Sequence, residues 1–343
     1  MIGVLWRMFA VLLACAPGLA SRADEVSDFY HGKTVTIVVG YSTGGGYDLQ
    51  ARVLAKYWPK YIPGNPVVIV QNMPGAASVV AANSVNNTAP RDGTVVGMYS
   101  DANVIAPLMK VKGIQFDPRQ FGWIGSLAAR PTGVIFVRSD SPATTLEAAR
   151  EKEDILGALG PDATSTYALL ANDLFGTKFK LILGYKGGQE IHLAVQRGEV
   201  HGRAGYDWPS LVREYPQWIS EQFIKVIVQM ALEPDPDPAM KDVPVAINLA
   251  RNDEDKKILE LVLGTGRFQR AFSAPGGVPP ARLAALRDSF KATMSDPGFV
   301  ADMNKLSANG VTYAGAADIE AYMRNVYAFP PAVVERASKY FSE

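Results

Sequence analysis

Apolar positions along the chain follow two alternating patterns. A short β-branched run at residues 35–39 has the composition of a strand that is buried on both faces of a parallel sheet. After a glycine-rich loop, apolar side chains recur at the spacing of one helical face, at Ala51, Leu54, Ala55, Trp58, Tyr61 and Ile62. The pattern predicts a strand, a loop and an amphipathic helix.

This alternation continues along most of the chain. Further strands are expected at residues 67–70 and 94–98, and the pattern restarts with strands at 134–137, 155–159, 179–183, 200–204 and 223–230. Helices are expected to begin near Thr164, Gly188 and Trp208. Strands that alternate with helices are typical of parallel sheets covered on both faces. We therefore expect an α/β fold with two domains of the same construction.

The last part of the chain has a different pattern. Alternating prolines in the segment EPDPDP, residues 233–238, break regular structure, and either a return between domains or an ordinary surface loop fits them. The last hundred residues are expected to be helical and to pack on the first domain; one helix begins at Pro280. The predicted division is residues 24–130 with 236–343 as domain 1, and residues 131–235 as domain 2.

The N-terminus has the features of an export signal. Arg7 precedes an apolar stretch at residues 8–13, and Ser21 and Ala23 occupy the −3 and −1 positions of a cleavage site. We expect residues 1–23 to be a cleaved signal peptide, which places the mature protein in the periplasm. Lipidation of Cys15 is the alternative, because Leu-Leu-Ala-Cys resembles a lipobox.

Composition excludes several classes of protein. The chain has 343 residues with 48% hydrophobic content, which is enough for two globular domains. It has 34 basic and 34 acidic residues, so no global charge attracts nucleic acid or an anionic membrane. No run after the leader reaches the about 18 apolar residues of a membrane span. We expect a monomer that binds no nucleic acid.

Three consecutive glycines, Gly44, Gly45 and Gly46, lie between the first strand and its helix. The G-x-G-x-x-G fingerprint fails because Leu49 stands where its last glycine is required, and no Walker Gly-Lys-Ser/Thr follows. A loop without side chains lets a carboxylate or phosphate reach the free amides of the helix N-terminus. A tight turn that binds nothing fits this stretch equally well.

Catalytic and metal sites have little support in the sequence. Glu190, His192 and His201 are the candidates for a metal site, but their spacing matches no recognised ligand motif. No recognisable catalytic pair of carboxylates occurs. We therefore expect no enzyme activity, no metal and no cofactor.

Loops of small polar residues precede several expected helices. They lie at residues 41–48, 72–78 and 100–103 in the first domain and at 164–166 and 184–190 in the second. Such loops at the carboxyl ends of strands favour a shared anion cleft, although hydroxyls there are also ordinary helix caps. Asp48 and Asp207 each fit a structural role at a helix start or a ligand contact. Lys186 fits either a carboxylate partner or a solvated surface lysine.

Five segments in this order carry a family resemblance: IVVGYSTGGGYD, VIVQNMPGAAS, APRDGTVVGM, GYKGGQE and FSAPGGVPPARLAALRDSFKATMSDPGF. Together they resemble the extracytoplasmic solute receptors of tripartite tricarboxylate transporters, the Bug-type or TctC-like binding proteins. The resemblance extends from about Phe29 to the C-terminus. It implies a periplasmic-binding-protein-like fold of type II, with two doubly wound α/β domains joined by two crossing strands and a ligand cleft between them.

The resemblance also implies which residues contact the ligand. The family's glycine motif matches Gly44, Gly45, Gly46 and Asp48, and its N-x-x-G-A-like motif matches Asn72, Gly75 and Ala76. The expected ligand-binding set is Tyr41, Ser42, Thr43, Gly45, Gly46, Asp48, Asn72, Gly75, Ala76, Ser78, Ser165, Thr166, Tyr185, Lys186, Gly187 and Asp207. Where many relatives have prolines this chain has Ser42 and Thr43, and Ala77 and Ser78 replace a common glycine pair, which leaves the substrate open.

The function implied is capture of a small organic carboxylate by domain closure and its delivery to the membrane subunits of a transporter. Di- and tricarboxylates fit this description, and an aromatic carboxylate is an alternative because several aromatic residues lie near the loop ends. Two other functions remain open: an exported hydrolase or lyase that uses the same cleft, and a ligand-sensing subunit of a signalling system.

Overall fold

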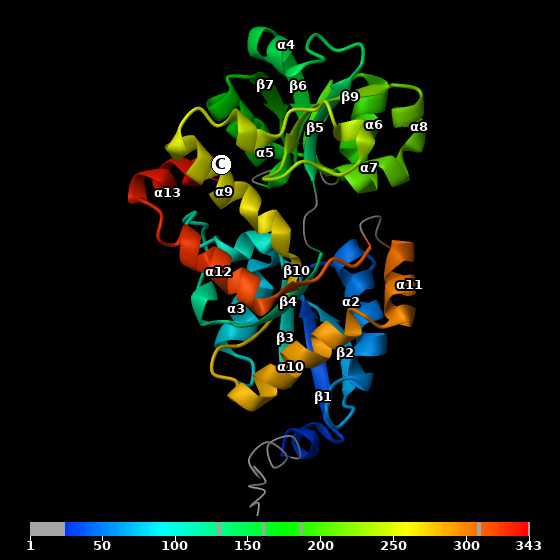
Figure 1. The fold of residues 1–343 in the computed structure, drawn as a ribbon, viewed down its shortest axis with the longest axis vertical. Coiled ribbons are helices and arrows are strands. Elements are labelled where there is room, and N and C mark those ends of the chain that lie inside the picture. The colour runs from blue at the N-terminus through cyan, green and yellow to red at the C-terminus, as the bar shows by residue number, and fades with distance from the viewer. Residues whose placement is uncertain (1–24, 129–131, 160–161, 186–187, 307–309, 342–343) are drawn as a thin grey trace, which may run out of the picture.

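The computed structural model describes residues 25–128, 132–159, 162–185, 188–306 and 310–341. The elements form two lobes stacked along the long axis of the molecule, and each lobe is built around one sheet (Figure 1). The expected signal peptide, residues 1–23, lies outside the described residues. Within the described ranges, no helix is both long and apolar enough to cross a bilayer.

The first lobe contains a six-stranded sheet in the order β11-β4-β10-β3-β1-β2. Its strands are β1 (Thr34–Val39), β2 (Val67–Asn72), β3 (Val95–Tyr99), β4 (Gly122–Ala128), β10 (Gln269–Ala274) and β11 (Ala314–Gly315). Strands β1, β2 and β3 are parallel, as the apolar runs predict, and β10 lies antiparallel between β3 and β4. The loops that leave the parallel strands therefore emerge together at one edge of the sheet.

The second lobe contains a five-stranded sheet in the order β7-β6-β8-β5-β9. Its strands are β5 (Gly133–Arg138), β6 (Glu153–Gly157), β7 (Lys178–Ile182), β8 (Gly202–Asp207) and β9 (Ile224–Met230). Strand β6 is parallel to β7 and β8, whereas β5 is antiparallel to both of its neighbours. All five strands were expected from the sequence, with boundaries that differ by no more than three residues.

Helices cover both sheets and also connect the lobes (Figure 1). The first lobe carries α2 (Gly46–Tyr57), α3 (Val79–Asn87), α10 (Pro280–Thr293), α11 (Pro297–Leu306) and α12 (Ala316–Val326). The second carries α4 (Leu146–Glu151), α5 (Ala163–Phe175), α6 (Gly188–Arg197), α7 (Trp208–Glu214) and α8 (Pro216–Ser220). Helices α9 (Asp253–Leu263) and α13 (Pro331–Ser338) lie along one side, beside α5.

Helix α2 shows how the apolar pattern becomes packing. Ala51, Leu54 and Trp58 are fully buried in one core with the side chains of β1. Burying a side chain such as Leu54 stabilises the fold by about 2 kcal/mol. The Trp58 indole N–H also donates to Ser289 Oγ at 2.9 Å, which ties α2 to α10. The predicted buried face of this helix is therefore confirmed.

The chain returns to the first lobe through α9. The buried side chain of Gln229, near the end of β9, donates to the carbonyls of Met240 at 2.9 Å and Val243 at 2.8 Å. Its Oε1 accepts from the Asp235 N–H at 2.8 Å. These bonds hold the proline-rich segment and the residues after it against the second sheet. Helix α9, which follows this segment, runs from the second lobe toward the first (Figure 1).

Helix α13 attaches the C-terminal segment to the second lobe. Arg336 on α13 pairs with Asp173 on α5 at 2.9 Å and with Glu254 and Asp255 on α9 at 2.9 and 3.2 Å. Asp255 is fully buried, so this guanidinium neutralises a carboxylate that water does not reach. The C-terminal residues thus pack on both lobes, not on the first domain alone as the sequence suggested.

The structure departs from the expectation of a helical C-terminal third at β10 and β11. Strand β10 has the sequence QRAFSA, which lacks the β-branched residues that mark a strand. Its position between β3 and β4 supplies the pairing, and its last four residues are buried there. Tertiary pairing thus overrides weak local propensity at this strand.

Candidate ligand-binding site

The three loops that follow β1, β2 and β3 are packed against each other. A glycine is required at position 40, directly after β1, because the second loop passes very close to it. A Cβ at this position would lie 2.1 Å from the Cβ of Ser78. Ser78 itself is fully buried and has a left-handed φ of 70°. Its Oγ accepts from the N–H of Ser100 at 2.8 Å and from Asn103 Nδ2 at 3.0 Å. Ser78 therefore connects all three loops and lies beneath them.

Asp48 organises the glycine loop from inside the first turn of α2. Its buried carboxylate accepts from the Gly44 N–H at 2.8 Å and from Arg52 Nε at 3.0 Å. A second Arg52 nitrogen lies 2.9 Å from Oδ1. Hydrogen bonding from Arg52 is the largest cause of the lowered pKa of Asp48. These contacts favour the structural interpretation of Asp48.

Asn72 completes this network from the end of β2. Its Nδ2 donates to Asp48 Oδ1 at 3.0 Å and to the Tyr41 carbonyl at 2.9 Å. Its Oδ1 accepts from Thr43 Oγ1 at 3.1 Å and from Arg52 Nη2 at 3.2 Å. Both polar ends of Asn72 thus hold the loop of residues 41–44 in place. We conclude that Asp48 and Asn72 shape the loop.

The glycine loop leaves the N-terminus of α2 open. Gly45 occupies the N-cap position and provides no side-chain hydrogen bond to the helix. The first amides of a helix have no acceptor within the helix, and they carry partial positive charge. Gly45 and Gly46 are exposed, so the loop has the features of an anion site.

Arg270 adds a positive charge beside this helix start, and sequence reasoning missed it. Its guanidinium lies 5.1 Å from the centre of the Tyr47 ring, and Nη2 would lie 3.7 Å from a Cβ at Gly46. Nη1 donates to Gln269 Oε1 at 2.9 Å, while Nε is buried without a partner among the described residues. A left-handed φ of 58° at a non-glycine residue is a strained conformation of the kind that concentrates at functional sites.

In the second lobe, α5 directs its N-terminus toward these loops. Asp162 caps the helix by accepting from the Thr164 N–H at 2.9 Å, and the Leu159 N–H donates to Thr164 Oγ1 at 2.9 Å. Ser165 Oγ donates to the Asp162 carbonyl at 3.3 Å, and Thr166 Oγ1 donates to the Tyr340 carbonyl at 3.2 Å. The hydroxyls expected to bind a ligand therefore make bonds within the protein.

A cavity of about 350 Å³ lies between the two lobes. Its walls combine the first-lobe loops, the N-terminal part of α5 and one side of α9. Of the predicted residues, it is lined by Tyr41, Ala76 and Thr166. The rings of Tyr41 and Tyr47, 4.1 Å apart between centroids, form part of its wall with Tyr167.

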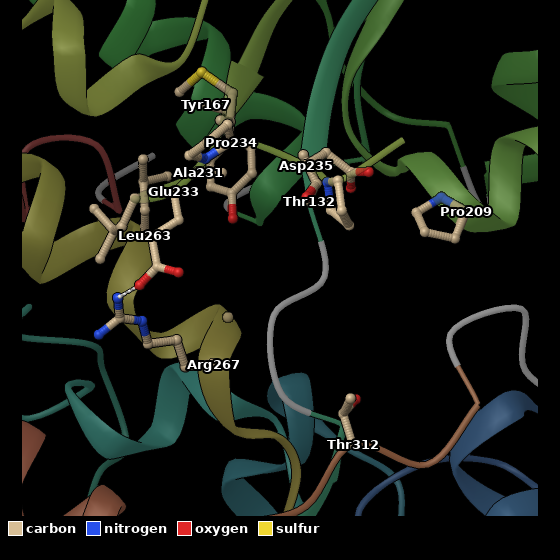
Figure 2. Close-up of a pocket in the computed structure, with 14 residues that line it drawn as sticks. Thr132, Tyr167, Pro209, Ala231, Glu233, Pro234, Asp235, Leu263, Arg267 and Thr312 are labelled. Carbon is tan, nitrogen blue, oxygen red and sulfur yellow. Dashed lines mark hydrogen bonds and ion pairs between the residues drawn. The ribbon is translucent and has the colours of Figure 1, made fainter. Parts of the chain in front are cut away.

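A second cavity of about 310 Å³ lies beside the connecting segments, and Tyr167 lines both cavities. Figure 2 shows Arg267 paired with Glu233 at 3.0 Å on one side, and Thr312 of the first lobe across from Thr132. The space between the lobes therefore extends from the first-lobe loops to the connecting segments.

The other predicted residues that the structure describes are not part of the lining of the first cavity. Ser42, Thr43, Gly45 and Gly46 are exposed on the glycine loop, and Gly75 precedes Ala76 with a positive φ of 145°. Tyr185 packs toward Gly157 inside the second lobe, 3.2 Å from a Cβ built there. Asp207 caps α7 by accepting from Ser210 N–H at 3.2 Å and Oγ at 2.7 Å. Lys186 and Gly187 lie outside the described residues.

The histidines do not form a metal site. His201 Nδ1 lies 2.7 Å from Asp154 Oδ1, and His192 Nε2 lies 3.1 Å from Arg203 Nη1. Burial lowers the pKa of His192 to about 3, so this imidazole is neutral at physiological pH. Across the described ranges, no cluster of three or more His, Cys, Asp or Glu side chains is placed to hold a metal ion.

Comparisons with known proteins agree with this architecture. Residues 51–203 match the family described as Tripartite tricarboxylate transporter family receptor, TctC. A protein of Cupriavidus necator described as "UPF0065 protein in gbd 5'region" is 27% identical over 339 residues, which cover 94% of this chain and 90% of that protein.

Two solved structures share the fold. A TctC solute binding protein from Polaromonas, without ligand, superposes with a TM-score of 0.67 at 19% identity and covers 90% of this chain and 99% of its own. MatC from Rhodopseudomonas palustris with bound malate has a TM-score of 0.60 at 19% identity, with 90% and 99% coverage. The matched family consists of receptors, not enzymes, as the sequence predicted. The chain therefore has the periplasmic-binding-protein fold of these solute-binding proteins, and its residues 51–203 are similar to the TctC receptor family.

Proposed function

We propose that this protein captures a small organic carboxylate between its two lobes and delivers it to the membrane subunits of a tripartite transporter. The observation that carries the proposal is the interdomain cavity, whose walls combine first-lobe loops with the start of α5. Ligands of open α/β sheets bind at such carboxyl ends of strands. The malate in the similar MatC structure supports a carboxylate as the ligand class.

The first lobe supplies the anion contacts in this proposal. A carboxylate accepts from the amides of Gly45 and Gly46 and from the hydroxyl of Ser42, while Thr43 keeps its hydrogen bond to Asn72. Asp48 and Asn72 act indirectly, because their hydrogen bonds keep this loop in position. Gly75, Ala76 and Ser78 provide the second loop, and their positive φ values turn its backbone toward the first loop.

The second lobe closes over the ligand in this proposal. The cavity-lining Thr166 and Tyr167 approach from α5, and Ser165, Tyr185, Lys186, Gly187 and Asp207 are assigned to the same wall on closure. Groups from both lobes surround a small anion only when the cleft shuts, so ligand binding shifts the population toward the closed form.

We further propose that the protein acts in the periplasm after removal of residues 1–23, as a monomer, with lipidation at Cys15 as the alternative anchor. The membrane subunits would recognise the closed form. No cofactor or metal takes part in this scheme.

Isothermal calorimetry against malate, succinate, citrate, adipate and benzoate tests the proposal. At least one of these is expected to bind, and small-angle scattering is expected to show compaction with that ligand. Arg270→Gln is expected to weaken binding about tenfold because the carboxylate loses a nearby cation. Arg197→Gln, an exposed arginine on α6, is the matched control and leaves binding unchanged. Silence across the panel would contradict the proposal.

A further inference from the structure

The first cavity has an unusual set of charges for a carboxylate receptor. Its described lining includes two carboxylates, Asp101 and Asp162, and no lysine, arginine or histidine. A ligand that carries only negative charge would meet these carboxylates at close range, and like charges repel strongly where water is scarce. The lining thus disfavours a dicarboxylate that has no positive group and favours a ligand that carries one.

The two carboxylates differ in how they are used. Asp162 caps α5 through the Thr164 N–H at 2.9 Å and also accepts from the Thr164 hydroxyl. Asp101 lies two residues after the end of β3. It forms no ion pair with any cation among the described residues. Burial is the largest cause of its raised pKa, opposed by backbone N–H groups, the Thr265 hydroxyl and the more distant charge of Arg270. Asp101 is therefore a cavity carboxyl group without a cationic partner.

Aromatic rings surround the same space. Tyr41, Tyr47 and Tyr167 all line the cavity, and the electrostatic field of Asp101 reaches all three hydroxyls. Burial raises the pKa of each phenol, so the three rings are neutral. An ammonium group is attracted to the faces of such rings as well as to a carboxylate. Tyrosine rings beside an unpaired aspartate therefore form a favourable site for a cation.

A positive charge also lies against Tyr47. The Arg270 guanidinium stacks on this ring at 5.1 Å and lies beside the N-terminus of α2 at Gly46. Asp101 raises and Arg270 lowers the pKa of Tyr47, so both charges act on this one phenol. The positive and negative poles of the site are thus close together, as the poles of a zwitterion are.

We propose that the ligand is an amino carboxylate, whose ammonium group pairs with Asp101 among Tyr41, Tyr47 and Tyr167 while its carboxylate faces α2 and Arg270. Apolar side chains such as Met109, Val111 and Val262 line the remainder of the cavity. They favour an amino acid with an apolar or aromatic side chain. This inference rests on the proposed capture of a carboxylate and names the class of carboxylate.

Matched ligand pairs test the inference by calorimetry on the mature chain. Leucine and 4-methylpentanoate share a carbon skeleton and differ by the ammonium group, as do phenylalanine and 3-phenylpropanoate; aspartate and malate differ by ammonium against hydroxyl. In at least one pair the amino member is expected to bind about tenfold or more tightly than its partner, as a charge-assisted hydrogen bond predicts. The Asp101→Asn variant is expected to reduce that ratio to near one, and Asp288→Asn, an exposed position on α10, to leave it unchanged.

The possible outcomes separate the two proposals. If carboxylates bind but their amino partners bind no better, or if Asp101→Asn keeps the preference, the inference is overturned and carboxylate capture stands. If no member of any pair binds, the proposed capture of a carboxylate is itself contradicted. A Tyr167→Leu variant provides a second test that keeps Asp101 in place. It is expected to lower the preference for the amino member, and an unchanged preference would count against the aromatic part of the site.

Discussion

Replacing Asp48 tests whether the glycine loop depends on a buried carboxylate. The Asp48→Ala change removes the acceptor for three donors: the Gly44 N–H, Asn72 Nδ2 and the Arg52 guanidinium. Hydrogen bonds to a charged group contribute about 1.5–3 kcal/mol each when buried. The Arg52 side chain is 47% exposed and regains water, so its share is small. We expect a loss of about 2–3 kcal/mol in the free energy of unfolding.

Urea unfolding followed by tryptophan fluorescence measures this loss, with Arg52→Met as the matched variant that removes only the half-exposed partner. The sign of the pH dependence follows from the lowered pKa of Asp48. Stabilisation by this carboxylate is complete above its unfolded pKa of about 4 and is lost as the pH falls through the lower folded value. The difference in the free energy of unfolding between wild type and Asp48→Ala therefore disappears at acid pH. Unchanged stability at pH 7 together with lost ligand binding would refute the structural role.

Three further predictions concern other parts of the fold. Gly40→Ala is expected to destabilise the first lobe by about 2 kcal/mol or more, because its Cβ would lie 2.1 Å from that of Ser78; a melting temperature equal to wild type would contradict this. Asp101→Asn is expected to raise the melting temperature at pH 7 but not at pH 3. The pKa of Asp101 is raised in the folded state, so its ionisation destabilises the fold as the pH rises through that pKa. Equal changes in melting temperature at both pH values would contradict this prediction. Arg336→Met is expected to lower the free energy of unfolding by about 3 kcal/mol, because buried Asp255 then keeps only the half-exposed Arg251 as its cationic partner. An unchanged urea unfolding curve would show that Arg251 alone is sufficient.

Much of the architecture could be predicted because several strands carry their signal locally. The β-branched residues of β1 and the periodic apolar face of α2 follow from their own sequence, and all five strands of the second sheet were anticipated in this way. Strands β4 and β10 were not anticipated. Their pairing partners lie far apart in the chain, and the sequence of β10 carries no strand signal of its own.

The candidate site was predictable as a set of loops but not in the roles of single residues. The glycine run marked the start of α2, yet nothing local indicated that Asp48 and Asn72 use their polar atoms on the loop itself. Arg270 was missed because its position at the cleft edge depends on β10, which the sequence did not reveal. The sequence placed Asp101 in a polar loop after β3 and indicated nothing more about it. Its position in the cavity wall depends on the packing of α5 and α9 against that loop.

A crystal structure of the mature chain with the tightest ligand of the calorimetric panel tests the central claim most directly. The account predicts one carboxylate within about 3 Å of the amides that begin α2, with both lobes in contact with the ligand. A ligand bound outside the space between the lobes, or held by one lobe alone, would contradict it.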